Sequence, residues 1–288
     1  MYLEYIVKNI PDENDTINDI LQNELSISKR LQQFLTKNKL VLCNNYICNT
    51  NETIKINDKI TVNFDYPEDN SNIVPTQMNL DIIYEDEWIL ILNKPSGIAT
   101  HPSILHYSDS LSNGVRYYFD IINLKKKIRP VNRLDFYTSG LVIFAKCSYI
   151  HDMLSLQMQD GTFSKMYLAL INGKLESLNG IINLPIARKK DSIIERCVDF
   201  ENGKKAITQY EVIKYIKNQD CTLVKCNLLT GRTHQIRVHF SAIGHPLVGD
   251  TLYSNSNDKS ICGQKLHCYC LDFIHPITKK HIVIKKDI

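Results

Sequence analysis

The sequence VNRLDFYTSGLVIFA, residues 131–145, contains an aspartate followed by an apolar run, and the rest of the chain is interpreted from these two features. Its last part, Leu141–Ala145, is an unbroken apolar run that favours a buried β-strand. Asp135 precedes this strand among arginine, threonine, serine and glycine, so we expect it at a turn whose backbone amides can orient its carboxylate. An isolated aspartate in such a place is most often a turn cap. The segment alone therefore leaves a structural and a reactive interpretation open.

Strand patterns dominate the sequence on both sides of this segment. A hairpin is predicted where Ile82–Tyr84 and Trp88–Asn93 flank an acidic stretch. Helical spacing returns only around Ser148–Met158 and from Thr233 onward, so a doubly wound parallel sheet is not expected. The patterns GxGxxG, GxxxxGK[ST] and GxSxG are absent, which removes the main signatures of dinucleotide enzymes, P-loop NTPases and serine hydrolases. Further strands are expected at Leu141–Ala145, Phe163–Ile171, Thr208–Tyr215, Thr222–Leu229 and from Ile282.

Composition and targeting signals favour a folded cytoplasmic protein. The 288 residues are 43% hydrophobic and 23% charged, as in ordinary globular chains. No apolar run is long enough to cross a bilayer, and Glu4 and Lys8 interrupt the start where a signal peptide would be apolar. Nine cysteines are then expected as reduced thiols. The cluster Cys262, His267, Cys268 and Cys270 lacks finger-like spacing, so we expect no metal.

Charge is unevenly distributed along the chain. Residues 1–65 carry 7 basic and 9 acidic residues, and residues 66–288 carry 27 and 22, which gives net charges of −2 and +5. The bias is compatible with a polyanionic partner and equally with an ordinary solvated surface. Three basic runs could contact phosphates or be solvated loops: Lys125–Arg129, Arg188–Lys190 and Lys204–Lys205.

The composition of residues 66–80, with two prolines and three asparagines, predicts a linker between domains of residues 1–65 and 81–288. Upstream, Thr16 and Ser28 are candidate N-caps of two short helices, and strands are expected at Lys39–Leu42 and Lys59–Phe64. This order resembles the S4 type of RNA-binding domain. The resemblance implies an α/β module whose second helix presents Lys29 and Arg30 to RNA. A packing module with solvated lysines is the alternative.

The second domain resembles the RluA family of RNA pseudouridine synthases. RLDFYTSGL contains the family signature RLDxxTSGL, and the other motifs follow in the family's order over residues 81–277. This chain departs from the family at Asn132, where histidine is usual, and at Cys268, where alanine is common. The matching segments are Asn93–Gly97 with His101-Pro102, Lys165–Ala169, Leu229–His239, Gly244–Asp250, Leu266-His267 and Phe273–Pro276.

The resemblance implies an α+β fold with a mostly antiparallel mixed sheet, and an enzyme that converts uridine to pseudouridine in ribosomal or transfer RNA. It implies Asp135 as the catalytic aspartate, Tyr167 as the active-site tyrosine and Arg237 as the basic partner of the aspartate. An ionised carboxylate is needed to attack the sugar or base or to take a proton, and a neighbouring arginine lowers a carboxyl pKa. The sequence does not choose among these routes, and a proton-removing role for Tyr167 stays open.

Helical spacing from Thr233, the expected N-cap, to Gly244 predicts a helix with Arg237 near its N-terminal turn. His234 and His239 are five residues apart, which does not put two zinc ligands on one face. Both are expected to pack or to form hydrogen bonds.

RNA is the expected partner, contacted by a monomer with no metal or organic cofactor. A stacked uridine must be turned out of the helix before it can react, and the resemblance implies that Arg133 fills the vacated space. The remaining residues expected to contact RNA are Asn132, Arg232 and His234. Two other functions were considered: an RNA-binding protein that has lost catalysis, and a glycoside hydrolase, which normally needs a second carboxylate that does not recur near Asp135.

Overall fold

A small antiparallel sheet with two short helical segments forms the N-terminal part of the protein. The computed structural model describes residues 1–9, 14–254 and 263–288. Within them the first sheet has the strand order β1-β4-β2-β3, and both helices expected from the sequence are present. The elements are β1 (Tyr2–Ile6), α1 (Ile17–Asp19), the π-helical turn η1 (Ile20–Glu24), α2 (Lys29–Lys37), β2 (Val41–Cys43), β3 (Tyr46–Ile47) and β4 (Lys59–Asn63).

The two expected N-caps of this domain differ in how they act. Thr16 and Asp19 form a reciprocal capping box at the start of α1. Ser28 occupies the N-cap position of α2, but its hydroxyl donates to Asp152 Oδ2 at 3.2 Å instead of capping the helix. β1 was not expected from the sequence; its side chains alternate between exposed and half-buried.

The main sheet contains nine strands among the described residues and follows the order β5-β6-β7-β14-β8-β13-β12-β9, with β15 paired to β14. Within the described part of the chain only β7 and β14 are paired in parallel, so the expected α+β fold with a mostly antiparallel mixed sheet is confirmed. The strands are β5 (Asp81–Glu85), β6 (Ile89–Lys94), β7 (Ser139–Ala145), β8 (Ser164–Asn172), β9 (Asn179–Asn183), β12 (Ile207–Ile216), β13 (Cys221–Leu228), β14 (Leu266–Ile274) and β15 (His281–Lys285).

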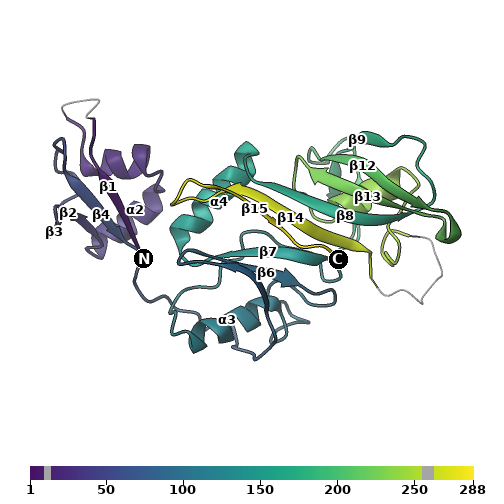
Figure 1. The fold of residues 1–288 in the computed structure, drawn as a ribbon, viewed down its shortest axis with the longest axis horizontal. Helices are drawn as coiled ribbons and strands as arrows, with labels where there is room; N and C mark the ends of the chain where they lie inside the picture. The colour runs from purple at the N-terminus through teal and green to yellow at the C-terminus, as the bar shows by residue number, and fades with distance from the viewer. Residues whose placement is uncertain (10–13, 255–262) are drawn as a thin grey trace.

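The other elements surround this sheet, and Figure 1 shows α4 between it and the N-terminal domain. α3, with Gly114 in its interior, was not expected from the sequence. A Cβ at Gly114 would lie 2.4 Å from Met78 Cγ, so the missing side chain admits the segment before β5. The elements are α3 (Leu111–Ile121), α4 (Ser148–Asp160), β10 (Ile186–Arg188), β11 (Arg196–Val198), the 3-10 turn η2 (Lys217–Gln219) and α5 (Gln235–Ala242).

A glycine fixes the sheet directly after the Asp135 turn. Gly140 pairs with Cys268 across the parallel β7–β14 contact and has a φ of +112°. A Cβ there would lie 2.2 Å from the Cys268 carbonyl oxygen. Only glycine permits this approach, which anchors the turn that carries Asp135 to the centre of the sheet.

Aromatic and basic side chains join the N-terminal sheet and the segment after it to the rest of the chain. Phe64 stacks on Tyr149 of α4 with ring centroids 5.2 Å apart. The Lys126 ammonium donates to the carbonyls of Phe64 and Tyr66, and Arg129 pairs with Glu68. Two members of the basic run Lys125–Arg129 therefore hold the chain together and do not present their charges as phosphate contacts. Residues 66–80 contain no helix or strand, and the domain boundary there stays a prediction.

Candidate active site

The turn that carries Asp135 is held by side chains from the preceding segment. Thr100 Oγ1 donates to the Leu134 carbonyl at 2.9 Å and accepts the Leu134 amide at 3.1 Å. The Lys94 ammonium is fully buried and donates to the Phe136 carbonyl at 3.1 Å and to two further carbonyls. Burial lowers the pKa of Lys94 to about 7, against the opposing influence of Asp135. The backbone on both sides of Asp135 is thus fixed.

Arg237 and not the backbone orients the Asp135 carboxylate. Arg237 Nη1 donates to Asp135 Oδ2 at 3.1 Å. Among the described residues no backbone amide is hydrogen-bonded to this carboxylate, so the expectation that turn amides orient it was wrong. Oδ1 has no hydrogen-bond partner there either, and Asp135 is one of the residues that line a cavity of about 610 Å³. One oxygen is held and the other is open.

A second carboxylate holds the other side of the Arg237 guanidinium. Arg237 donates from Nε to Asp250 Oδ2 at 2.7 Å and from Nη2 to Asp250 Oδ1 at 2.8 Å. The Asp250 side chain is fully buried, and the guanidinium carbon lies 4.9 Å from the Tyr253 ring centroid. Such a two-pronged pair fixes the plane of the guanidinium. Asp250 ends the matching segment Gly244–Asp250, but no role was expected for it from the sequence.

α5 begins with His234 and not with the expected Thr233. His234 adopts a left-handed φ of 58° at the N-cap, which puts its Nε2 3.7 Å from Asp135 Oδ2. Its Nδ1 lies 2.8 Å from the Tyr253 hydroxyl, whose oxygen accepts the Arg196 amide. Burial, and to a lesser degree Arg237, lowers the pKa of His234 despite the opposing effect of Asp135. We assign the neutral form, with the proton on Nε2 directed at the carboxylate.

Tyr167 lies on β8 with its side chain almost fully buried at the cavity wall. Burial raises the pKa of its hydroxyl well above 10, and Cys268 and Asp135 add to the effect. A phenol with such a pKa stays protonated at neutral pH, so it can donate a hydrogen bond but is unsuited to remove a proton. Its ring offers a flat apolar surface within the cavity.

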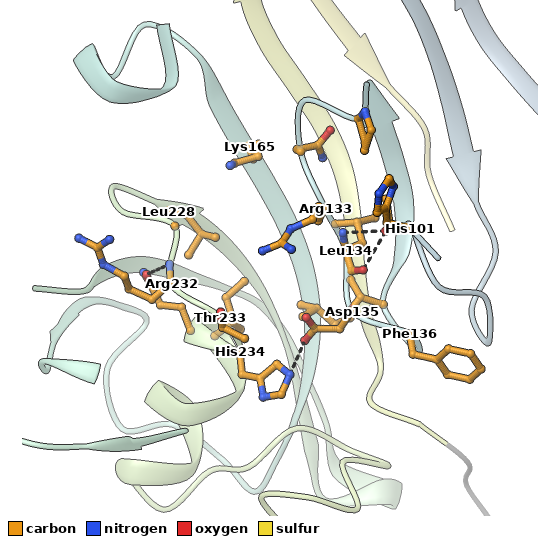
Figure 2. A pocket seen from close by; sticks show the side chains of 18 of the residues that line it. His101, Arg133, Leu134, Asp135, Phe136, Lys165, Leu228, Arg232, Thr233 and His234 are labelled. Atoms are coloured by element: carbon orange, nitrogen blue, oxygen red, sulfur yellow. Dashed lines mark hydrogen bonds and ion pairs between the residues drawn. The ribbon is translucent and has the colours of Figure 1, made fainter. Parts of the chain in front are cut away.

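Basic side chains line the cavity together with Asp135. Figure 2 shows Arg133 reaching into the cavity beside Asp135, with His234 approaching the carboxylate from another side and Lys165 farther along the wall. Arg133 is exposed, and it contributes, after burial, to lowering the pKa of His101. Arg232 is also exposed at the rim, where its Nε donates to the Lys205 carbonyl at 3.0 Å. The cavity therefore combines one carboxylate with a cationic surround.

Of the three other residues expected to contact RNA, Asn132 lines the cavity and the other two lie apart from it. Asn132 is buried, and its amide bonds the backbone of Leu141 and Ile143 at 3.1 and 2.9 Å. These bonds tie Asn132 to β7, and its contact with RNA stays a prediction. Lys29 and Arg30 are exposed at the start of α2 and do not line the cavity.

The residues considered as metal ligands have other partners. His239 contacts Thr208 Oγ1 and the Leu184 carbonyl, both at 2.9 Å, which confirms its expected hydrogen-bonding role. His267 contacts Ser139 Oγ and the Lys286 carbonyl. Cys262 lies outside the described residues. In the described part of the chain no group of three or more His, Cys, Asp or Glu side chains could hold a metal ion, and no helix is long and apolar enough to cross a membrane.

Comparison with known proteins assigns the chain to a family. Residues 88–242 match the RNA pseudouridylate synthase family. The uncharacterized RNA pseudouridine synthase YhcT of Bacillus subtilis is 35% identical, covering 96% of this chain and 91% of its own length. Ribosomal large subunit pseudouridine synthase D of Zymomonas mobilis is 36% identical over 80% of this chain and 75% of its own. The solved structure of human RNA pseudouridylate synthase domain containing 1 matches with a TM-score of 0.61 and 27% identity, over 73% of this chain and 84% of that one. The protein therefore belongs to the RNA pseudouridylate synthase family and is an RNA-modifying isomerase.

Proposed function

We propose that this isomerase converts uridines of large-subunit ribosomal RNA to pseudouridine in the cytoplasm and that Asp135 is its catalytic carboxylate. The observation that carries the catalytic part is the unequal state of the two Asp135 oxygens. Asp135 lines the cavity, and its Oδ2 is held by Arg237, whereas its Oδ1 has no hydrogen-bond partner among the described residues. Support for the ribosomal substrate is the similarity to the Zymomonas mobilis large subunit enzyme.

The reaction fits the groups around this carboxylate. The bond between uracil N1 and ribose C1′ breaks, the base turns, and C5 joins C1′; N1 gains a proton and C5 releases one. Oδ1 would act on the sugar or base, while Arg237 holds Oδ2 in place. Tyr167 would hold the turning base against its ring and donate a hydrogen bond from its hydroxyl. The atoms balance without an oxidant or a second substrate.

Binding of the RNA is assigned to the basic surround and to the first domain. Arg133 would occupy the space that the everted uridine leaves, and Arg232 and His234 would contact the strand at the cavity rim. We further propose residues 1–65 as an S4-like RNA-binding domain, with Lys29 and Arg30 on phosphates, residues 66–80 as the linker and residues 81–288 as the catalytic domain. We expect the protein to act as a monomer.

The test uses unmodified large-subunit ribosomal RNA, transcribed with tritium at uridine C5. The wild-type protein should release tritium to water, because C5 loses its hydrogen when it joins C1′. Mapping the product should then identify the uridines modified. Asp135→Asn should bind the same RNA with unchanged affinity but release no tritium.

Each part of the proposal has its own contrary result. Release from transfer RNA but not from ribosomal RNA would overturn the substrate class. Release by Asp135→Asn at the wild-type rate would overturn the role of Asp135. RNA binding without release by the wild-type protein would favour an RNA-binding protein that has lost catalysis.

A further inference from the structure

Two large aliphatic side chains stand fully in solvent on a turn beside the active-site cavity. Ile104 is 99% exposed and Leu105 is 87% exposed. Tyr107, two residues farther along, is 62% exposed. Singly exposed apolar residues are ordinary on protein surfaces, but consecutive ones that no other element covers call for a partner. We call Ile104, Leu105 and Tyr107 the apolar tip.

The backbone holds the apolar tip outward. Ser103 and His106 exchange both backbone hydrogen bonds, at 3.2 and 3.1 Å, so Ile104 and Leu105 occupy the two central positions of a tight turn. His106 Nδ1 lies 3.0 Å from Asp109 Oδ2, which braces the same turn. The exposure of the two aliphatic side chains thus follows from a defined turn and not from an unstructured loop.

The base of the turn is joined to the segment that carries Asp135. The ring of His106 stacks on Phe136, the residue after Asp135, with centroids 4.6 Å apart. On the other flank His101, Pro102 and Ser103 line the cavity itself. The turn that carries the apolar tip is therefore packed against the residue that follows the reactive carboxylate.

The opposite rim of the cavity is cationic. Figure 2 places His101 and Phe136 on one side of Asp135, and Arg232 and His234 on the other. A nucleic acid strand that delivers a uridine to Asp135 would meet guanidinium groups on one side and aliphatic and aromatic side chains on the other. Phosphates pair with the first kind of surface and the faces of unstacked bases with the second.

We propose that the apolar tip stacks on an unpaired RNA base next to the everted uridine. This inference rests on the proposed function and extends it, because it assigns a base-binding surface outside the cavity. The occupant is the face of a base and not a protein or a lipid, since the surface continues directly into the site where a uridine must enter. Stacking of this kind tolerates any base, because every base has an apolar face.

The test is equilibrium binding of a 20-nucleotide oligouridine and of a strand of equal length that lacks the bases. The double variant Ile104→Ser/Leu105→Ser should weaken binding of oligouridine about tenfold, the effect of losing one stacked base. It should leave binding of the abasic strand unchanged. The slope of log affinity against log salt should also stay at its wild-type value, because no phosphate contact is removed.

A matched control uses two exposed aliphatic residues elsewhere, Leu178 and Ile181, which are 71% and 64% exposed and do not line the cavity. Leu178→Ser/Ile181→Ser should bind oligouridine within about twofold of wild type, since it makes the same kind of change away from the RNA path. Arg232→Gln should instead reduce the salt slope. Leu105→Trp should tighten oligouridine binding, because an aromatic ring stacks better than an aliphatic chain.

Unchanged oligouridine affinity in the Ile104→Ser/Leu105→Ser variant would overturn the inference, as would an equal loss on the abasic strand or an altered salt slope. A wild-type protein that binds both strands equally would also overturn it. Failure of the proposed function is seen separately, as absence of tritium release by the wild-type protein from ribosomal RNA. Thermal unfolding of the double variant should match wild type, because both side chains are exposed.

Discussion

The active site has a buried end, which we call its base, and a partly exposed end, which we call its mouth. The two ends use carboxylates in opposite ways. At the base Asp250 is fully buried and gives both oxygens to Arg237, whose guanidinium lies beside Tyr253. At the mouth the Asp135 side chain is 28% exposed and gives Arg237 one oxygen only. Arg133 and Arg232 stand exposed beside it.

The difference shows how a buried arginine can hold a reactive carboxylate and still leave one of its oxygens free for the substrate. A guanidinium taken out of water needs a full counter-charge, and Asp250 supplies it. Arg237 can then offer its remaining nitrogen to Asp135 and leave one Asp135 oxygen for the substrate. We expect structural effects from changes at the base and functional effects from changes at the mouth.

The largest effect is expected from Asp135→Ala at the mouth. Turnover should fall about 10⁴-fold or more, because the variant removes the group that acts on the substrate. The free energy of unfolding should change by less than about 0.5 kcal/mol, since the side chain is partly exposed and Arg237 keeps its main partner. Tritium release and urea unfolding measure the two quantities. A loss of unfolding free energy as large as that expected for Asp250→Ala would contradict the difference between mouth and base.

The same substitution at the base, Asp250→Ala, should lower the free energy of unfolding by about 3–5 kcal/mol, because it leaves the buried Arg237 guanidinium without its main counter-charge. Asp250→Asn keeps the shape and serves if the alanine variant does not fold; it should lose less stability but still lower the rate of turnover. Urea unfolding gives the comparison with Asp135→Ala. Equal unfolding midpoints for the two alanine variants would contradict the proposed support by Asp250.

A smaller effect is expected from Arg133→Ala, which leaves both carboxylates in place. Single-turnover rates on a folded stem-loop that contains a mapped target uridine should fall about tenfold, because the space left by the base is no longer filled. Rates on an unpaired strand of the same sequence should change less. Equal losses on both RNAs would assign Arg133 to phosphate binding instead.

The smallest effect is a pH dependence that arises from the buried His239 of α5. Burial lowers the pKa of His239 below its usual 6.5. The folded protein therefore takes up this proton less readily than the unfolded chain. The stabilisation that comes from burying His239 in its neutral form is fully present above pH 6.5. It is lost as the pH falls through the lower pKa that His239 has in the folded protein. Urea unfolding between pH 7.5 and 5 should show this decline.

His239→Gln should flatten part of that decline, while His151→Gln, a change at an exposed side chain, should not. A decline that is the same in His239→Gln and in wild type would show that other groups cause it.

Much of the fold could be predicted from the sequence because the central strands are apolar runs. The hairpin of β5 and β6, the strand after Asp135 and the helix of Arg237 were all expected and are present. α3 was missed because Gly114 interrupts its helical pattern. β9 was missed because its side chains are mostly exposed. The S4 assignment of the first domain stays a prediction.

The site was only partly predictable, for reasons of burial. The pairing of Asp135 with Arg237 was expected and is present at 3.1 Å. Asp250 was missed because nothing in a sequence distinguishes a buried acid from an exposed one. The bonds of the Asn132 amide to the backbone of β7 were likewise not expected. The left-handed His234 at the start of α5 replaces the expected Thr233 cap because only that backbone turn brings the imidazole to Tyr253.

The most direct test of the central claim is a crystal structure of the enzyme bound to an RNA that contains a mapped target uridine. We expect the uridine everted into the cavity, Asp135 Oδ1 within about 3.5 Å of its C1′ atom, and Oδ2 still paired with Arg237. A uridine seated with its sugar away from Asp135, or with Oδ1 turned onto a protein group, would contradict the account.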